Sequence, residues 1–196
     1  MDGSAAFTDD ILHTAIEVVG QGGDSLLASL DDLPAPIYVT DADGMVTHFN
    51  QACIGFAGRT PAVGKDRWCV TWKLYTDDGE PLPHDQCPMA IAILQRREVR
   101  GVTAIAERPD GARVHFQPFP TPFFGPDGEL LGAVNMLIDV TEVRQIAELR
   151  DQARRCRRLA AGAGDQRTAD TLNLFAEECE AKAADLERAA QPRAMV

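Results

Sequence analysis

Short runs of apolar and β-branched residues, separated by turn sequences, recur between residues 36 and 139. Residues 37–40 (Ile-Tyr-Val-Thr) form the first run, residues 41–44 (Asp-Ala-Asp-Gly) suit a turn, and residues 45–49 (Met-Val-Thr-His-Phe) form the second. This order predicts a β-hairpin, because the glycine can take a positive φ in the turn. Three further runs, each followed or preceded by a turn, predict strands at 99–107, 112–119 and 130–139.

The sequence between the second and third predicted strands favours short helices. Asn50 can cap a helix that runs through Phe56, and Pro88 can open another that continues to about Arg97. Residues 72–83 are interpreted as a turn-centred element. Five antiparallel strands with short flanking helices make an α+β domain.

Both ends of the chain show helical periodicity. Near the N-terminus, Thr8 suits the cap of a helix that continues to Val19, and residues 25–33 predict a second short helix before Pro34. After residue 141, apolar residues recur at spacings of three and four as far as the loop at 162–165. The expected organisation is N-terminal helices at 1–32, an α+β domain at 33–144, and a C-terminal helical hairpin with its tail at 145–196.

The last predicted helix carries a heptad seam of mostly small residues, which are Ala169, Leu172, Ala176, Cys179, Ala183, Leu186 and Ala190. Residues 142–159 carry six basic and three acidic side chains, whereas residues 166–190 carry three basic and six acidic ones. Opposite charges favour an antiparallel hairpin or a four-helix dimer. We expect a homodimer, because an apolar seam on a monomer's surface would be exposed to water.

Composition and charge narrow the class of partner. The chain of 196 residues has a formal net charge of −11, which would repel a phosphate backbone or an anionic lipid surface. Neither nucleic acid nor a membrane is expected as a partner, and no apolar run approaches the roughly 20 residues that span a bilayer. With no signal peptide recognisable, a cytoplasmic location is expected. The five cysteines include no Cys-x-x-Cys pair, so reduced thiols are expected.

The stretch from about Leu33 to Arg144 resembles a PAS sensor domain. Residues 36–44 (Pro-Ile-Tyr-Val-Thr-Asp-Ala-Asp-Gly), followed by Phe49-Asn50, are similar to the opening strand, turn and second strand of that family. Residues 139–144 (Asp-Val-Thr-Glu-Val-Arg) are similar to its exit from the last strand into a signalling helix. Residues 78–90 resemble the subgroup found ahead of bacterial histidine kinases.

The resemblance implies a module that binds a ligand and relays its state, rather than an enzyme. PAS domains differ in their ligands from one member to the next, so the fold does not name the ligand. No kinase or cyclase motif follows residue 144. The expected output is therefore dimerisation or contact with a separate signalling protein, such as a histidine kinase. The Asn-Cys-Arg motif of the flavin photosensors is absent, and light sensing through flavin is not expected.

Several side chains are candidates for contact with a small ligand. Asn135 interrupts an apolar strand, and a buried amide needs hydrogen-bond partners, which are either a ligand or neighbouring backbone. Trp68 and Trp72 offer flat apolar area for a ring-bearing ligand, although they could equally seal the core. The set of expected ligand-binding residues is Asn135, Trp68, Trp72, His84, Cys87 and Phe116.

Cys87 and His84 leave further alternatives open. A cysteine followed by proline at a helix N-terminus favours thiolate character, and a thiolate or an imidazole can ligate haem iron. Haem is therefore a possible cofactor, and a haem or redox sensor is the alternative function. With Cys69 the pair could also form a metal site, but the spacing matches no zinc signature. A Cys87 nucleophile with His84 as base would make a thiol enzyme. The simplest interpretation is that Cys87 is a small buried apolar residue.

The expected relay lies where the last strand meets the following helix. Thr141 is expected to cap that helix through its hydroxyl, and Asp139 to hold the strand exit through hydrogen bonds to backbone amides. A change in the ligand pocket would then pass from the strand to the C-terminal helices.

Overall fold

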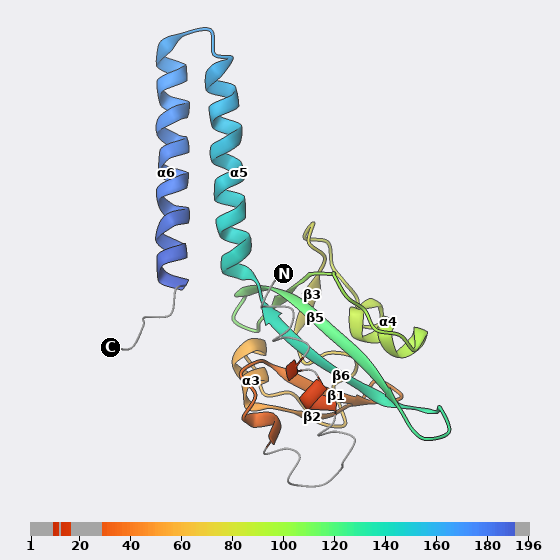
Figure 1. Cartoon of the computed structure of the whole chain (residues 1–196). Helices are drawn as coiled ribbons and strands as arrows, with labels where there is room; N and C mark the ends of the chain where they lie inside the picture. Colours follow the sequence, from red (N-terminus) through yellow and green to blue (C-terminus); the bar gives the residue numbers. More distant parts are fainter. Residues whose placement is uncertain (1–9, 12, 17–28, 191–196) are drawn as a thin grey trace. The chain divides into compact units, whose positions relative to one another are not determined.

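The computed structural model of the protein describes residues 10–11, 13–16 and 29–190 (Figure 1). The named elements are β1 (Ile37–Asp41), β2 (Val46–Phe49), α3 (Gln51–Ala57), β3 (Lys73–Tyr75), the 3₁₀ helix η1 (His84–Gln86), α4 (Pro88–Gln95), β4 (Ala104–Glu107), β5 (Arg113–Phe124), β6 (Leu130–Asp139), α5 (Thr141–Ala161) and α6 (Gln166–Ala190). Of the two helices predicted before residue 33, residues 10–11, 13–16 and 29–31 are helical, and the remainder lies outside the described residues.

The strands form one antiparallel sheet in the order β2-β1-β6-β5-β4-β3. The predicted α+β class is confirmed, but the sheet has six strands and not five. The additional strand, β3, lies at the start of the segment that was interpreted as a turn, and it pairs with β4 through Lys73–Tyr75. The central strands β1 and β6 pair over five residues, so both ends of the domain sequence lie in the middle of the sheet.

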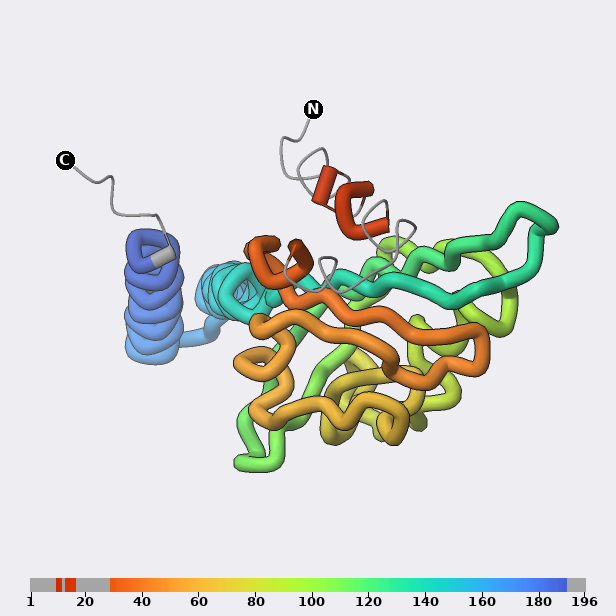
Figure 2. Tube along the Cα trace, turned by 90° about the horizontal axis from the view of Figure 1, so that it is seen from below, coloured from red at the N-terminus to blue at the C-terminus, as the bar shows by residue number. Residues whose placement is uncertain are grey.

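Each face of the sheet has its own apolar cluster, because side chains alternate along each strand. On β1, Tyr38 belongs to the larger cluster with side chains of α3, α4 and the segment 68–74, whereas Ile37 and Val39 belong to the other. Leu30 and the helical residues Ile11, Ala15 and Ile16 cover this second face. Figure 2 shows these red residues on one side of the strands and the yellow segment on the other.

The helices α5 and α6 form an antiparallel hairpin, and they lie side by side in both views (Figures 1 and 2). The predicted seam of α6 is covered by α5 of the same chain, with Ala153, Cys156, Ala176 and Cys179 buried together. The predicted helical hairpin is therefore confirmed. Because α5 already covers the seam, its burial does not require a second copy, and the expected homodimer stays a prediction.

The chain divides into two compact units between Asp139 and Val140. The first holds the sheet and its flanking helices, and the second is the α5–α6 hairpin. Among the described residues, no helix combines the length and the apolar character needed to cross a bilayer.

Candidate functional site

A cleft of about 500 Å³ opens beside the loop that joins α3 to β3. Its walls combine aromatic, cationic and acidic side chains, namely Arg59, Lys65, Asp66, Arg67, Trp68, Cys69, Thr71, Trp72, His84 and Asp85. A smaller hollow of about 270 Å³ adjoins it, and Trp72 and His84 line both. We call the larger one the Trp68 cleft.

Trp68 is held in an unusual backbone conformation. Its φ is 68°, in the left-handed region that side chains other than glycine rarely adopt. The Trp68 N–H donates to the Gly44 carbonyl at 2.7 Å, and the indole lies so close to Gly44 that a Cβ there would come within 2.1 Å of the ring. The Arg67 guanidinium lies 4.7 Å from the ring centroid on Trp68. The glycine of the predicted hairpin turn thus makes room for this tryptophan.

Charged side chains give the cleft a net cationic lining. Arg59 pairs with Asp66 at 2.7 Å, which also accepts a hydrogen bond from the Ala62 N–H. Lys65 makes no ion pair with any residue in the part of the chain that the structure describes. Three cations and two carboxylates line the cleft of a protein whose overall charge is −11, so the cleft is a local exception to the acidic surface.

His84 contributes a buried nitrogen to the cleft wall. Its side chain is half-buried, and its Nε2 atom has no hydrogen-bond partner among the described residues, as is also true of Arg59 Nε. Burial lowers the pKa of His84 below its ordinary value, and the positive charge of Arg59 lowers it further. The imidazole is therefore neutral at neutral pH.

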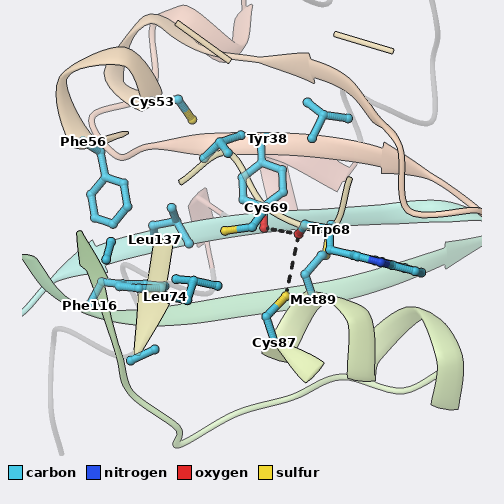
Figure 3. Close-up of a cluster of buried hydrophobic side chains, with 14 of the residues drawn as sticks. Tyr38, Cys53, Phe56, Trp68, Cys69, Leu74, Cys87, Met89, Phe116 and Leu137 are labelled. Atoms are coloured by element: carbon cyan, nitrogen blue, oxygen red, sulfur yellow. Dashed lines mark hydrogen bonds between the residues drawn. The ribbon is translucent and has the colours of Figure 1, made fainter. Parts of the chain in front are cut away.

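A hydrogen bond connects the backbone of Trp68 to Tyr38 on β1 (Figure 3), and a second one continues to Asn135 on β6. The Tyr38 hydroxyl donates to the Trp68 carbonyl at 2.9 Å and accepts from Asn135 Nδ2 at 3.0 Å. The other end of the amide, Asn135 Oδ1, accepts from the Phe119 N–H at 2.9 Å. Burial raises the pKa of Tyr38 well above its usual range, so the hydroxyl keeps its proton. We call this series the Trp68–Tyr38–Asn135 chain.

The six predicted ligand-binding residues divide between two places. Trp68, Trp72 and His84 line the Trp68 cleft, where Trp72 is 54% exposed, but Trp68 is only 8% exposed and its ring also belongs to the large core cluster. The other three are buried in the core: Asn135 with both polar atoms bonded, Phe116 edge-on to the Phe56 ring, and Cys87 beside Trp68. Of the two alternatives given for Asn135, a ligand or neighbouring protein groups, its contacts match the second.

The thiol of Cys87 does not have the character that its position before Pro88 suggested. Its Sγ points to the Trp68 carbonyl at 3.9 Å, and burial raises its pKa to about 12. It is therefore a neutral thiol that contacts no base, and His84 lies in the cleft instead. The donor set does not fit haem ligation by a Cys87 thiolate, and no group of three metal-ligating side chains occurs among the described residues.

The strand exit differs in detail from the prediction. Helix α5 begins at Thr141 with Val140 at the N-cap position, and no side-chain hydrogen bond caps the helix there. Thr141, the predicted cap, thus occupies the first helical position, one residue beyond the observed N-cap at Val140. Asp139 is the last residue of β6 and pairs with Phe116 in the sheet.

Sequence reasoning did not single out Tyr38 or the cations of the cleft. Tyr38 looked like one more aromatic residue of a strand, and its role depends on a contact with Trp68, thirty positions away in the sequence. The cations did leave a signal, since Lys65 and Arg67 stand directly before Trp68 in an acidic chain.

Comparison with known proteins identifies the family. The family model described as "PAS fold" matches residues 30–145. Similar solved structures include a Rhodobacter sphaeroides LOV protein, at 14% identity and a TM-score of 0.47 over 89% of this chain and 98% of that one. The PAS domain of the fruit-fly ELK potassium channel is 12% identical, with a TM-score of 0.45 over 60% and 96%. The light-state dimer of the fungal photoreceptor Vivid is 18% identical, with a TM-score of 0.43 over 55% and 79%. No curated protein matches the chain.

Proposed function

Because the chain belongs to the PAS family of sensor domains, we propose that it senses a small ligand in the Trp68 cleft and relays the occupied state to the α5–α6 hairpin. The observation that carries this proposal is the Trp68–Tyr38–Asn135 chain. It joins the wall of the cleft to β6, and β6 leads through Val140 directly into α5.

The proposed relay begins at the contact between the ligand and Trp68. A ligand stacked on the cleft wall displaces the Trp68 backbone, which already has a strained φ. The Trp68 carbonyl is bonded to Tyr38, so a displacement must either move Asn135 on β6 or break a buried hydrogen bond. Asp139 and Thr141 are the proposed points at which this movement enters α5.

The lining of the cleft indicates the class of ligand. The exposed indole of Trp72 offers flat apolar area beside the buried edge of Trp68, and Lys65 supplies a cation without an ion-pair partner among the described residues. A small, flat ligand that carries an anionic group, such as an aromatic carboxylate, fits these features. A cleft of about 500 Å³ lies within the usual range of small-molecule sites.

Tryptophan fluorescence tests the ligand directly, because Trp68 and Trp72 are the two tryptophans of the chain and both line the cleft. The protein is titrated with benzoate and, as the matched neutral probe, benzamide. We expect saturable quenching by benzoate. Benzamide lacks the negative charge and should bind roughly tenfold more weakly, which corresponds to a loss of about 1.4 kcal/mol of binding free energy. Lys65→Gln should weaken the binding of benzoate, whereas Lys182→Gln on α6 should leave the affinity for benzoate unchanged.

Amide exchange tests the relay. Saturating benzoate should alter exchange across residues 141–161 in the wild type, and Tyr38→Phe should abolish that response while benzoate still binds. The ligand proposal would be refuted if neither benzoate nor benzamide gave saturable quenching and if the native mass of the purified protein equalled that of the chain alone. An α5 response that survives Tyr38→Phe would refute the relay.

The proposed partner of the hairpin is a second copy of the chain. Leu159, Leu174 and Phe175 remain exposed after the seam is buried. The opposite net charges of α5 and α6 also allow two hairpins, related by a two-fold axis, to place the basic helix of one against the acidic helix of the other. Light scattering after size exclusion tests this. A mass near 21.3 kDa at micromolar concentration means that the output partner is a separate signalling protein.

A further inference from the structure

Two of the five cysteines meet inside the C-terminal hairpin. Cys156 on α5 and Cys179 on α6 belong to the same four-residue buried cluster, with Ala153 and Ala176 beside them. They are 9% and 4% exposed. The cleft and the Trp68–Tyr38–Asn135 chain use neither of them, so they need a separate explanation.

Ion pairs across the hairpin fix the register of these two residues. Arg150 pairs with Glu187 at 2.7 Å, and Arg157 pairs with Glu180 through Nη2 and Oε2 at 2.7 Å. Seven residues forward on α5 thus correspond to seven residues backward on α6, as an antiparallel pair requires. The buried residues of the seam match in reverse order, with Ala153, Cys156 and Ala160 on α5 facing Ala183, Cys179 and Ala176 on α6, so the two cysteines lie in one layer of the seam.

The neighbouring layers allow the two helices to approach closely. Ala153, Ala160, Ala176 and Ala183 are all buried along the seam, and none has a side chain beyond Cβ. Bulky residues at these positions would hold the helix backbones apart. A disulfide needs Cα atoms within about 4.4–6.8 Å of one another, which is a spacing that small seam residues favour.

We propose that Cys156 and Cys179 form a reversible disulfide that locks α5 to α6 when the protein meets a peroxide. The sulfur of one cysteine attacks a peroxide oxygen, the O–O bond breaks, and a sulfenic acid and water are formed. The sulfur of the second cysteine then attacks the first, the S–S bond forms, and a second water leaves. Two thiols lose two electrons in total, and one hydrogen peroxide is reduced to two waters.

The remaining three cysteines share the large core cluster of the sheet domain, where Cys69 lies near both Cys53 and Cys87. Cys53 donates to the Ile37 carbonyl and Cys69 lies 3.1 Å from the Thr71 hydroxyl, both within the sheet domain. Burial raises the pKa of Cys53 and of Cys87 to about 12, which keeps these thiols in the unreactive form. The oxidant-responsive pair is therefore confined to the hairpin, and this inference does not depend on the function proposed for the cleft.

Tryptic peptide mapping of the oxidised full-length protein tests the proposal. Trypsin cleaves after Arg157, Arg158 and Arg167, so the peptides that hold Cys156 and Cys179 separate unless a disulfide joins them. After treatment with hydrogen peroxide, we expect the joined pair, two hydrogens lighter than its parts, to exceed any other cysteine linkage at least tenfold. Dithiothreitol should separate it. Sulfenic or sulfinic acids at these cysteines without a joined pair would overturn the proposal.

Variants and isotope mixing complete the test. Cys156→Ala and Cys179→Ala suit a seam that is already rich in alanine, and each should abolish the joined pair, whereas Cys53→Ala in the sheet domain should retain it. In a mixture of ¹⁴N and ¹⁵N protein, the pair should join peptides of the same isotope. Mixed-isotope pairs would place the disulfide between two chains and overturn the lock within one hairpin. Oxidation should also slow amide exchange across 141–190 in wild type but not in Cys156→Ala.

Discussion

Replacing Tyr38 by Phe removes one oxygen atom from the middle of the Trp68–Tyr38–Asn135 chain and leaves the ring in place. The hydroxyl makes two buried hydrogen bonds, to the Trp68 carbonyl at 2.9 Å and from Asn135 Nδ2 at 3.0 Å. Tyr38 and Asn135 are 0% and 2% exposed, so water cannot replace either partner without a rearrangement. The Trp68 carbonyl would keep the weak contact with Cys87 at 3.9 Å.

The expected loss of stability follows from those two unsatisfied groups. A buried donor or acceptor left without a partner costs about 1–3 kcal/mol, so Tyr38→Phe should lower the free energy of unfolding by about 2–6 kcal/mol. In urea, with a slope of about 2 kcal/mol per molar, the midpoint should fall by roughly 1–3 M. Tryptophan fluorescence is the suitable probe, because both tryptophans lie in the sheet domain.

Tyr75→Phe is the matched control, since Tyr75 is the other tyrosine of the chain. It is half-buried on the short strand β3, its ring contact with Arg113 at 4.3 Å does not require the hydroxyl, and the hydroxyl itself interacts with the charged side chains of Glu107 and Arg113 at the solvent-exposed edge. Its substitution should change stability by less than about 0.5 kcal/mol. Equal effects of the two substitutions would refute the reasoning, because the loss could then not be assigned to the buried hydrogen bonds.

Three further predictions concern the surroundings of the cleft and the core thiols. Burial lowers the pKa of His84 in the folded protein. As the pH falls, His84 therefore binds a proton in the unfolded chain before it does so in the folded protein. Stability is therefore fully present above about pH 6.5 and declines as the pH falls below it, and His84→Gln should flatten that decline in urea unfolding measured across the acidic range. Gly44→Ala should destabilise the domain by about 2 kcal/mol or more and shift the fluorescence of Trp68, because φ is +82° and the new Cβ would overlap the indole; an unchanged urea midpoint would contradict the packing described. Cys53 and Cys87, with pKa values raised to about 12, should resist iodoacetamide in the native protein at about pH 8 and react once urea unfolds it; alkylation of either at the rate of a free thiol would contradict their burial.

Elements whose sequence signal lies within one continuous stretch of the chain could be predicted. The hairpin at 36–49 has its turn glycine and its runs of apolar residues side by side, and the α6 seam repeats without a break, so both could be predicted from the sequence. The strand β3 has three residues, which is too few for alternation to show. The strand β5 carries three prolines at alternate positions, at 118, 120 and 122, and it continues past the last two to Phe124, five residues beyond the predicted end. Those prolines lie beyond Phe116, where pairing of β5 with β4 ends, so β5 need not bond a strand on both sides there.

The candidate site was predicted in part, for a physical reason. Trp68, Trp72 and His84 do line one cleft, because they stand on the connecting segments around β3, and such segments lie at the surface, although the Trp68 ring itself is only 8% exposed. Asn135 was placed on the correct face of β6 by alternation, together with Ala133 and Leu137. Its partner could not be predicted, since the choice between ligand, water and the Tyr38 hydroxyl depends on how segments far apart in sequence pack.

The energetics of the buried chain set the affinity that a signalling ligand needs. A ligand shifts an equilibrium between two states only by the difference in its affinity for them. If the signalling state breaks one hydrogen bond between Trp68, Tyr38 and Asn135, the cost is about 1–3 kcal/mol. A ligand of millimolar affinity has only about 4 kcal/mol of binding free energy, and breaking the hydrogen bond would consume a large part of that energy. A ligand of micromolar affinity has about 8 kcal/mol, which is enough to break the bond and remain bound. A ligand that signals through this chain should therefore bind Tyr38→Phe more tightly than wild type, because the variant has no bond left to break.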